Sequence, residues 1–319
     1  PCVSNDIYKL KNLLKNLGSN KFYLNKIILV FNDINNKSKE IQVKNIKQEL
    51  DYLIIIRKKR LNPGEARNLG LDNNRDKYIA FLDVSTIPED KWLEKTLFLI
   101  HDKNINGVLG NTKYIHKTSF EKSFIAATFG EKNLRTVPGA VFKRNFLHKV
   151  GYFLPNLRSG EDKEWTNRCK QLDHQIYLKN YGEIYYNGII NKSFISLCRK
   201  WFKNYSNYAH DYSIEIERQR FIYLSFFAFS IVVIARFWNN IAASWNESSI
   251  LYVPNITKIS LSLIIVFYLI TRLVFLTKKK SINLKNYNLI EIMNFICIGM
   301  ILDFIKLIAF ITTLLRKIF

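Results

Sequence analysis

The sequence predicts an α/β fold with a mostly parallel sheet, followed by an α-helical membrane region. Short apolar runs of strand length alternate with helical patterns as far as about Asn111. Polar side chains follow two of these runs, at the point where each predicted strand ends. From Phe221 onward the composition changes to long apolar stretches. We therefore expect two parts of different character.

The predicted strands are four runs rich in β-branched and aromatic residues, at residues 26–31, 52–56, 78–82 and 107–110. Between them lie helical patterns, with one apolar face formed by Leu10, Leu13, Leu14 and Leu17 and another by Trp92, Leu93, Leu97 and Ile100. Continuous apolar strands that alternate with helices indicate a parallel sheet covered on both faces.

Ligands of such sheets bind at the carboxyl ends of the strands. Asn32 and Asp33 follow the first run, and Asp83 follows the third. We expect both acids to face one crevice. The first helix begins almost directly after Pro1, whereas an α/β unit begins with a strand, so we expect that strand to be missing and the sequence to be a fragment.

The charge is strongly positive, with 48 Lys and Arg against 26 Asp and Glu, a net +22. This balance suits phosphorylated small molecules, anionic lipids or nucleic acid. The cations are spread along the chain, and outside the predicted membrane helix they form no stripe interleaved with stacking aromatics, so we do not expect a nucleic-acid partner. The four cysteines have no metal-binding or redox spacing, and their positions are Cys2, Cys169, Cys198 and Cys297.

Three apolar stretches, at residues 221–238, 259–276 and 289–315, are each long enough to cross a hydrocarbon core of about 30 Å. Between the first two, residues 239–257 carry only Glu247 as a charge, whereas Lys278, Lys279 and Lys280 follow the second. The positive-inside rule then places the α/β part in the cytosol, in agreement with the lack of a signal peptide. The predicted location is a bacterial-type inner membrane, which the chain crosses more than once.

The third stretch is interrupted by Glu291, Asp303 and Lys306. Asp303 and Lys306 are three residues apart, so we expect them to pair on one helix face, and we count two to three transmembrane helices. Residues 194–220 carry aromatics at helical spacing with basic residues between them, which predicts an amphipathic interfacial helix region. A helix packed on the globular part is the alternative.

Three motifs occur in a fixed order: Pro63-Gly64-Glu65-Ala66-Arg67-Asn68, Asp83-Val84-Ser85, and Gly160-Glu161-Asp162. With this order and spacing, residues 1–212 resemble the inverting family 2 glycosyltransferases of the GT-A fold, which is Rossmann-like, and which in this type is followed by C-terminal membrane helices. Residues 1–5 resemble the end of the family's first strand. The resemblance implies a GT-A catalytic domain at residues 1–193, the interfacial region at 194–220 and a membrane region at 221–319.

For the nucleotide sugar, the resemblance implies that Asp33 and Asn32 hold the base and ribose and that Gly64 and Arg67 serve the diphosphate. A helix start adds free N–H groups and a positive dipole there. Asp83 and Ser85 occupy the place of the family's Asp-x-Asp, which holds Mn²⁺ or Mg²⁺. Because divalent cations prefer carboxylate oxygens, Ser85 weakens this site and leaves Asp83 as its metal ligand.

For the acceptor, the resemblance assigns Asp162 as general base, with Glu161 beside it. Acids in the first turn of a helix are also stabilised by its dipole, and the two roles are compatible. Gly139, Trp165 and Trp201 are assigned to the acceptor side. Arg199-Lys200-Trp201 lacks the Gln that precedes the Arg-Trp of processive members, so we expect transfer of a single sugar.

These features together predict a membrane-bound inverting glycosyltransferase that moves one sugar from a nucleotide-diphosphate sugar, with UDP expected, to a lipid-linked or saccharide acceptor. Two alternatives differ in their requirements. A nucleotidyltransferase needs a glycine- and lysine-rich loop near the start of the chain, which is not seen there. A degenerate membrane scaffold or sugar-nucleotide sensor is favoured by Ser85 and Asn32, which replace acids of the family motifs.

Overall fold

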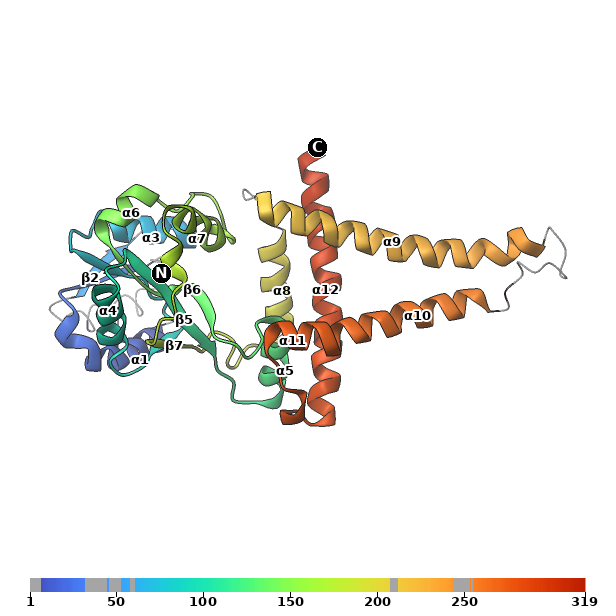
Figure 1. Ribbon diagram of the computed structural model, residues 1–319, viewed down its shortest axis with the longest axis horizontal. Coiled ribbons are helices and arrows are strands. Elements are labelled where there is room, and N and C mark those ends of the chain that lie inside the picture. Colours follow the sequence, from blue (N-terminus) through green and yellow to red (C-terminus); the bar gives the residue numbers. More distant parts are fainter. Residues whose placement is uncertain are drawn as a thin grey trace. The chain divides into compact units, whose positions relative to one another are not determined.

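The computed structural model describes residues 7–31, 45, 53–57, 61–206, 212–243, 253 and 255–318. The predictions made for residues 1–5, Asn32 and Asp33 therefore lie outside the described residues. The chain divides into two compact units (Figure 1). The first comprises Pro1–Glu121 and Lys132–Ser193, and the second comprises Lys122–Glu131 and Phe194–Phe319.

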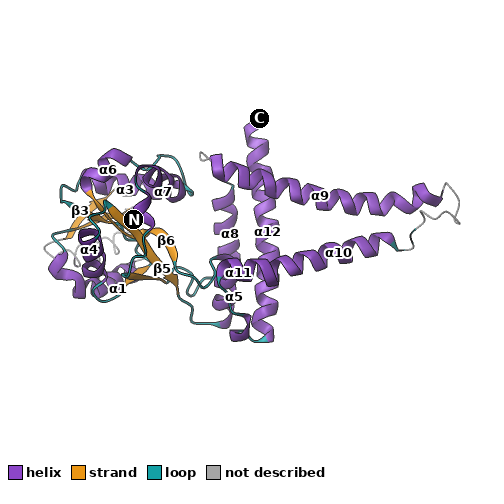
Figure 2. Ribbon diagram, in the orientation of Figure 1, coloured by secondary structure: helices purple, strands orange, loops and turns teal. Residues whose placement is uncertain are grey.

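The first unit contains two β-sheets (Figure 2). Strand β1 (Ile27–Phe31) pairs in parallel with β2 (Leu53–Arg57). The other sheet has the order β3-β6-β5-β7-β4. Its strands are β3 (Tyr78–Ala80), β4 (Thr86–Pro88), β5 (Gly107–Tyr114), β6 (Leu134–Lys143) and β7 (Glu183–Tyr186). The four predicted strands are confirmed as β1, β2, β3 and β5.

The expected mostly parallel sheet is corrected to a mixed one. Strand β6 inserts antiparallel between β3 and β5, and β7 is antiparallel to β4. Only β5 with β7 and β1 with β2 are parallel pairs among the described residues. The predicted α/β fold class itself is confirmed. Strand β6 was not among the predicted strands, and its Gly139 adopts φ +85° inside the strand, where β5 and β6 change register.

Helices cover these sheets. Both helices predicted from leucine and tryptophan spacing are present, as α1 (Ile7–Leu17) and α4 (Trp92–Asp102). They bury the apolar faces on which the prediction was based. The remaining helices of this unit, including two short 3₁₀ helices, are η2 (Gly18–Tyr23), α3 (Pro63–Asp72), α6 (Arg144–Val150), α7 (Glu161–Leu172) and η3 (His174–Tyr177).

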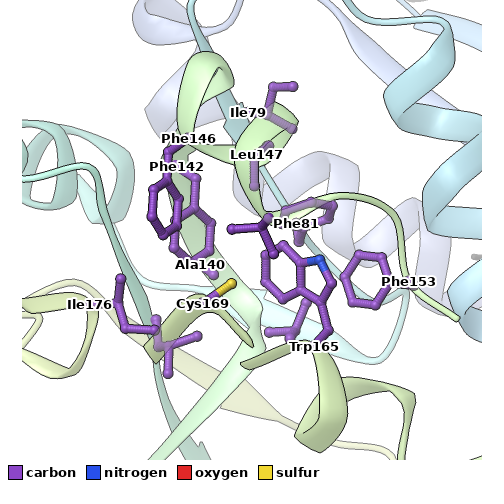
Figure 3. Packing of buried hydrophobic residues seen from close by; sticks show 13 residues of the cluster. Ile79, Phe81, Ala140, Phe142, Phe146, Leu147, Phe153, Trp165, Cys169 and Ile176 are labelled. Carbon is purple, nitrogen blue, oxygen red and sulfur yellow. The ribbon is translucent and has the colours of Figure 1, made fainter. Parts of the chain in front are cut away.

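The aromatic core of the first unit lies around Trp165 of α7 (Figure 3). Its ring stacks on Phe153 at a centroid distance of 4.5 Å and meets Phe142 edge-on at 5.5 Å. The indole Nε1 donates a hydrogen bond of 3.0 Å to the Gly151 carbonyl, so the polar atom is satisfied. This packing anchors the first turn of α7, which carries Glu161 and Asp162.

A cavity of about 350 Å³ lies between α1, β1, α3 and residues 78–82. Its lining is mostly aliphatic. In the described part of the chain, β1 pairs only with β2 and β3 pairs only with β6, so each strand has one edge that no described strand covers.

The second unit is helical. It contains α5 (Ser119–Thr128) from residue 122 onward, α8 (Phe194–Tyr205), α9 (Tyr212–Ala243), α10 (Ile256–Ile270) and α12 (Leu289–Ile318), with a π-helical segment at Thr271–Leu276 and α11 (Thr277–Lys280). Helix α12 packs along α8, and α9 runs beside α10 (Figure 1). Three segments are long and apolar enough to span a membrane: Glu215–Trp238, Ile256–Lys280 and Leu289–Arg316.

The expected pairing of Asp303 with Lys306 is wrong. Asp303 instead accepts a hydrogen bond of 2.6 Å from Arg272 Nη2 and one of 3.2 Å from the Tyr268 hydroxyl. Arg272 belongs to the neighbouring π-helical segment. Its guanidinium can reach Asp303 of α12 because Gly299, which has no side chain, leaves room for it. Lys306 lies against aromatic rings instead.

Candidate active site

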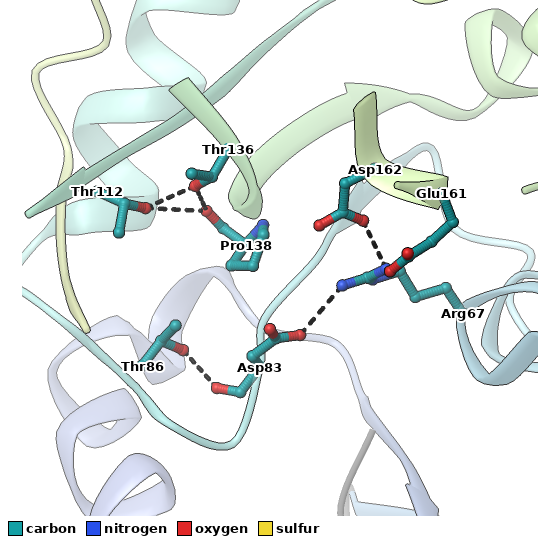
Figure 4. Close-up of polar contacts among 8 residues, drawn as sticks. All are labelled: Arg67, Asp83, Thr86, Thr112, Thr136, Pro138, Glu161 and Asp162. Carbon is teal, nitrogen blue, oxygen red and sulfur yellow. Dashed lines mark hydrogen bonds and ion pairs between the residues drawn. The ribbon is translucent and has the colours of Figure 1, made fainter. Parts of the chain in front are cut away.

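Arg67 binds three carboxylates at the centre of the candidate site (Figure 4). Its Nη1 lies 2.6 Å from Asp162 Oδ1 and 3.1 Å from Glu161 Oε1, and its Nη2 lies 3.3 Å from Asp83 Oδ1. The guanidinium is buried, with 5% of the side chain exposed. The structure thus brings Asp83 and Asp162 to one point, although 79 positions separate them in the sequence.

Local sequence explains how α3 presents Arg67. Asn62 caps the helix, Pro63 occupies its first position, and Glu65 completes a capping box through a bond of 2.7 Å from the Asn62 N–H. Arg67 follows on the next turn, where Phe153 lies under it at 5.4 Å from Cζ. The Arg67 guanidinium is thus held by the Phe153 ring on its face and by the three carboxylates at its nitrogen atoms.

The acids come from two places in the fold, the loop after β3 and the start of α7. Asp83 follows β3 in a turn closed by the Thr86 N–H and hydroxyl, which both donate to the Asp83 carbonyl. Glu161 and Asp162 begin α7 after Gly160, whose φ of +88° suits glycine. The positive end of the α7 dipole lies beneath these two acids and favours their ionised forms.

Burial and mutual charge change the acid–base properties of the cluster. Burial alone would lower the pKa of Arg67, but Asp162, Asp83 and Glu161 outweigh it and raise that pKa above its ordinary value. Burial and the neighbouring Asp162 raise the pKa of Glu161 to about 7, against the opposing effect of Arg67. Burial also raises the pKa of Asp162, whose side chain is 41% exposed, and Arg67 again opposes the shift.

Two tyrosines beside this cluster were missed by sequence reasoning. Tyr114 ends β5, Tyr186 ends β7, and their ring centroids are 5.0 Å apart. Burial, then Tyr186, then the charges of Asp83 and Asp162 raise the pKa of Tyr114, whose phenol is thus within electrostatic range of both acids. No strand-end signal marked either tyrosine in the sequence, because the predicted strand ended at residue 110 and no strand was predicted near Tyr186.

Ser85 receives a hydrogen bond of 3.2 Å from Lys9 Nζ, a buried lysine of α1. Asp83, the expected metal ligand, is already bonded to Arg67. No three His, Cys, Asp or Glu side chains in the described part of the chain are grouped so that they could hold a metal ion. A carboxylate bonded to a guanidinium, two residues from a hydroxyl bonded to an ammonium, does not match the oxygen-rich sets that Mn²⁺ and Mg²⁺ prefer.

The two predicted glycines have packing roles in this structure. A Cβ on Gly64 would lie 3.0 Å from the Phe153 Cβ, and one on Gly139 would lie 2.4 Å from Ile184 Cγ1. Gly64 lets α3 approach the segment before α7, and Gly139 lets β6 approach β7. The space beside each is thus filled by protein.

The two predicted acceptor-side tryptophans belong to different units. Trp165 is fully buried in the core, so it cannot touch an acceptor in this arrangement. Its separation of four residues from buried Cys169 is a helical core pattern that the sequence already contained. Trp201 belongs to the second unit, where it stacks on Tyr205 at 5.4 Å.

Comparisons with known proteins agree with these features. The family model described as glycosyl transferase family 2 matches residues 3–163. The chain is 23% identical over 186 residues to glycosyltransferase AglE of Haloferax volcanii, with 54% of this chain and 61% of that protein covered. It is 28% identical over 161 residues to an uncharacterized glycosyltransferase of Methanocaldococcus jannaschii, with 47% and 55% covered. The chain thus spans less than two thirds of either relative.

Two solved structures are similar over most of the chain. One is TarS of S. aureus in complex with UDP-GlcNAc, with a TM-score of 0.45 and 14% identity, covering 93% of this chain and 88% of that one. The other is the mannosyltransferase PcManGT of Pyrobaculum calidifontis with GDP-Man and Mn²⁺, with a TM-score of 0.49 and 11% identity, covering 97% and 84%.

Proposed function

Because the chain belongs to glycosyl transferase family 2, we propose that it transfers one sugar from a nucleotide-diphosphate sugar to an acceptor hydroxyl at a membrane surface. The observation that carries the proposal is the convergence of Asp83 and Asp162 on Arg67. An acid from the end of a strand and an acid from the start of a helix then border one site, as transfer between two substrates requires.

Asp162 acts as the general base. Arg67 bonds its Oδ1, and within the described residues Oδ2 makes no hydrogen bond, so Oδ2 is left to accept a proton. The acceptor hydroxyl gives this proton to Asp162 as its oxygen forms a bond to the sugar C1. The bond from C1 to the nucleotide diphosphate breaks on the opposite face, which inverts the anomeric centre. Glu161 positions Arg67 and does not touch the reacting atoms.

The nucleotide lies on the Asp83 side of the cluster. UDP is the expected donor nucleotide because an Asp at position 33 would accept a bond from the uracil ring N–H. The start of α3, with Gly64 in its first turn, contributes partial positive charge toward the diphosphate. Arg67 acts mainly as a brace, because its bonds are already directed at three acids. Arg67 is therefore not assigned as a direct ligand of the diphosphate.

No step of the reaction is assigned to a metal ion. Binding of Mn²⁺ or Mg²⁺ at Asp83 stays a prediction, and the Ser85 hydroxyl in contact with Lys9 argues for a weak site. When bound, such an ion would neutralise charge on the departing diphosphate. Equal transfer rates with and without EDTA would remove this prediction and leave the base assignment intact.

The acceptor is proposed to be lipid-linked and reached from the cytosolic face. Three segments long and apolar enough to cross a bilayer support membrane attachment. Lys278, Lys279 and Lys280 at the end of the second segment support the cytosolic orientation of the first unit.

The test supplies the full chain in membrane vesicles with labelled UDP-, GDP- and TDP-sugars and a lipid extract. Transfer from one donor is expected, with Asp162→Asn slowing it by about 10²- to 10⁴-fold. Asp102→Asn is the matched control, since it removes an exposed helical acid of the same unit. Transfer that survives Asp162→Asn would remove the catalytic assignment, and nucleotide-sugar binding without turnover in the unmodified chain would favour the scaffold or sensor alternative.

A further inference from the structure

Arg218, in the first turns of α9, is a buried cation with two hydrogen-bond donor atoms unused. The residue is 8% exposed, and its Nε and Nη1 are shielded from solvent and have no hydrogen-bond partner. Its Cζ lies 5.2 Å from the centre of the Phe310 ring, a contact that offsets only part of the lost hydration. A guanidinium in this state is short of an anionic oxygen.

A second cation, Lys306 of α12, adjoins the same ring. Its Nζ lies 4.8 Å from the centre of Phe221, 5.2 Å from Tyr205 and 6.0 Å from Phe310. The three rings also contact one another, since Phe310 meets Tyr205 at 5.5 Å and Phe221 at 5.9 Å. Two cations from α9 and α12 are thus held together by aromatic side chains of α8, α9 and α12.

The nearby acids do not neutralise this pair by direct contact. Asp303 is bonded to Arg272 at 2.6 Å, although its charge still reaches Lys306. Glu217 lies in electrostatic range of Lys306 and Glu215 in that of Arg218. Within the described ranges, no carboxylate oxygen forms an ion pair with Arg218 or Lys306. The pair is accordingly available for another anion.

The position of Arg218 indicates the source of that anion. Arg218 lies three residues before Phe221, where the apolar stretch of α9 begins, so the guanidinium lies at the end of that stretch and not in its middle. Helix ends of this kind lie at the depth of lipid headgroups. Helix α8, whose last residue Tyr205 borders the pair, carries further cations at Arg199, Lys200 and Lys203.

We propose that Arg218 and Lys306 bind the phosphate group of a membrane lipid. A guanidinium offers a planar fork to two phosphate oxygens, and an ammonium adds a point charge. Lys306 is only partly buried and provides the approach. Because Nε and Nη1 are enclosed, binding includes a rotation of the Arg218 side chain toward Lys306.

The test measures lipid retention by the full chain in dodecyl maltoside micelles, by native mass spectrometry and with no nucleotide sugar present. Its outcome is therefore independent of the proposed sugar transfer. The probes are dioleoyl phosphatidic acid, dioleoylglycerol, which has the same chains without phosphate, and inorganic phosphate. Phosphatidic acid is expected to be retained and dioleoylglycerol lost, and Arg218→Met with Lys306→Met should weaken retention by at least about tenfold.

Arg220→Met is the matched control, because Arg220 is exposed on the same helix two residues away and carries the same charge. It should retain phosphatidic acid like the unmodified chain. If Arg218→Met does not fold by circular dichroism, Lys306→Met alone should show the loss. The proposal is overturned by undiminished retention in the folded variants, by an equal loss in Arg220→Met, or by inorganic phosphate binding as tightly as phosphatidic acid.

Discussion

Arg67 Nη1 lies 2.6 Å from Asp162 Oδ1, so the buried brace of the site and its proposed general base are in direct contact. The same nitrogen bonds Glu161 at 3.1 Å. Stability and proton transfer therefore depend on one guanidinium, and substitutions around it should change both properties together.

Replacement of Arg67 by Met should destabilise the first unit by about 3–5 kcal/mol at pH 8, because a buried charge network then loses its only cation partner among the described residues. The loss should be smaller at pH 5, where Glu161 takes up a proton. Urea unfolding of the full chain in micelles, followed by tryptophan fluorescence, to which the buried Trp165 of this unit contributes, measures it.

Lys95→Met is the control for this experiment, since Lys95 pairs with Glu89 at 2.9 Å but is 42% exposed. It should lower stability by less than about 1 kcal/mol. Equal losses in the two variants would show that burial of the Arg67 network has no special weight.

Glu161→Gln should change how stability depends on pH. The pKa of Glu161 is raised from 4.5 to about 7 in the folded chain, so the folded state holds its proton longer than the unfolded state does. This contribution is complete below pH 4.5 and is lost as pH rises to about 7. Stability of the variant relative to the unmodified chain should thus rise across this window, by roughly 1–3 kcal/mol.

Unfolding titrations at several pH values measure this difference. Asp102→Asn, at an exposed helix end, should follow the unmodified chain at every pH. A Glu161→Gln curve parallel to that of the unmodified chain would contradict the raised pKa.

The rate of sugar transfer should fall as the medium becomes acidic, at a pH above the ordinary range of an aspartate. Burial raises the pKa of Asp162, and a protonated Asp162 cannot accept the acceptor's proton. Because Glu161 and Asp162 titrate together, the acid limb of kcat/KM belongs to the pair. Asp83→Asn should move that limb to lower pH by removing a like charge that raises the pKa of Asp162, and an unmoved limb would show that these two acids do not interact.

Ser85→Asp should strengthen Mn²⁺ binding, by at least about tenfold, because it adds a carboxylate two residues from Asp83. Titration of the full chain with Mn²⁺, followed by electron paramagnetic resonance, measures affinity without reference to activity. Ser85→Asn is the control of equal size without the charge. Equal affinities in the Asp and Asn variants would indicate that the two side chains do not share a ligand.

Gly110→Ala should destabilise the sheet by roughly 1–3 kcal/mol, because the added Cβ would lie 2.0 Å from the Pro138 carbonyl oxygen and force β5 away from β6. Gly70→Ala is the matched control. Its Cβ meets nothing nearer than Val30 Cγ2 at 3.9 Å, inside a helix where alanine is favoured by about 0.5–1 kcal/mol. Urea unfolding should separate the two variants in sign, and a neutral Gly110→Ala would contradict the close approach of the strands.

Much of the fold followed from local patterns. The apolar runs predicted β1 and β3, and the strand-end rule singled out Asp83, because both depend on neighbours in sequence. Strand β6 was hidden by Pro138 and Gly139, which local reasoning reads as a turn, whereas pairing with two partner strands fixes them as a strand.

The site was only partly predictable for the same reason. The order of the motifs identified Arg67 and Asp162 as candidate site residues, but their direct bond arises from packing between α3 and α7. The contact of Lys9 with Ser85 joins residues 76 positions apart, and no local pattern signals it. Tertiary contacts of this kind decide whether a polar side chain is a brace, a base or a ligand.

The membership of Lys122–Glu131 in the helical unit has a practical consequence. This segment lies between β5 and β6 in the sequence but belongs to the helical unit. Lys122 Nζ lies 2.8 Å from Glu291 Oε2, and the Ser123 hydroxyl donates a hydrogen bond to the Glu291 carbonyl. Truncation after Ser193 would strip the cover from Phe124 and Ala126, both buried now. The shortened polypeptide should aggregate in aqueous buffer, so purification of the whole chain in detergent or in a bilayer is preferable.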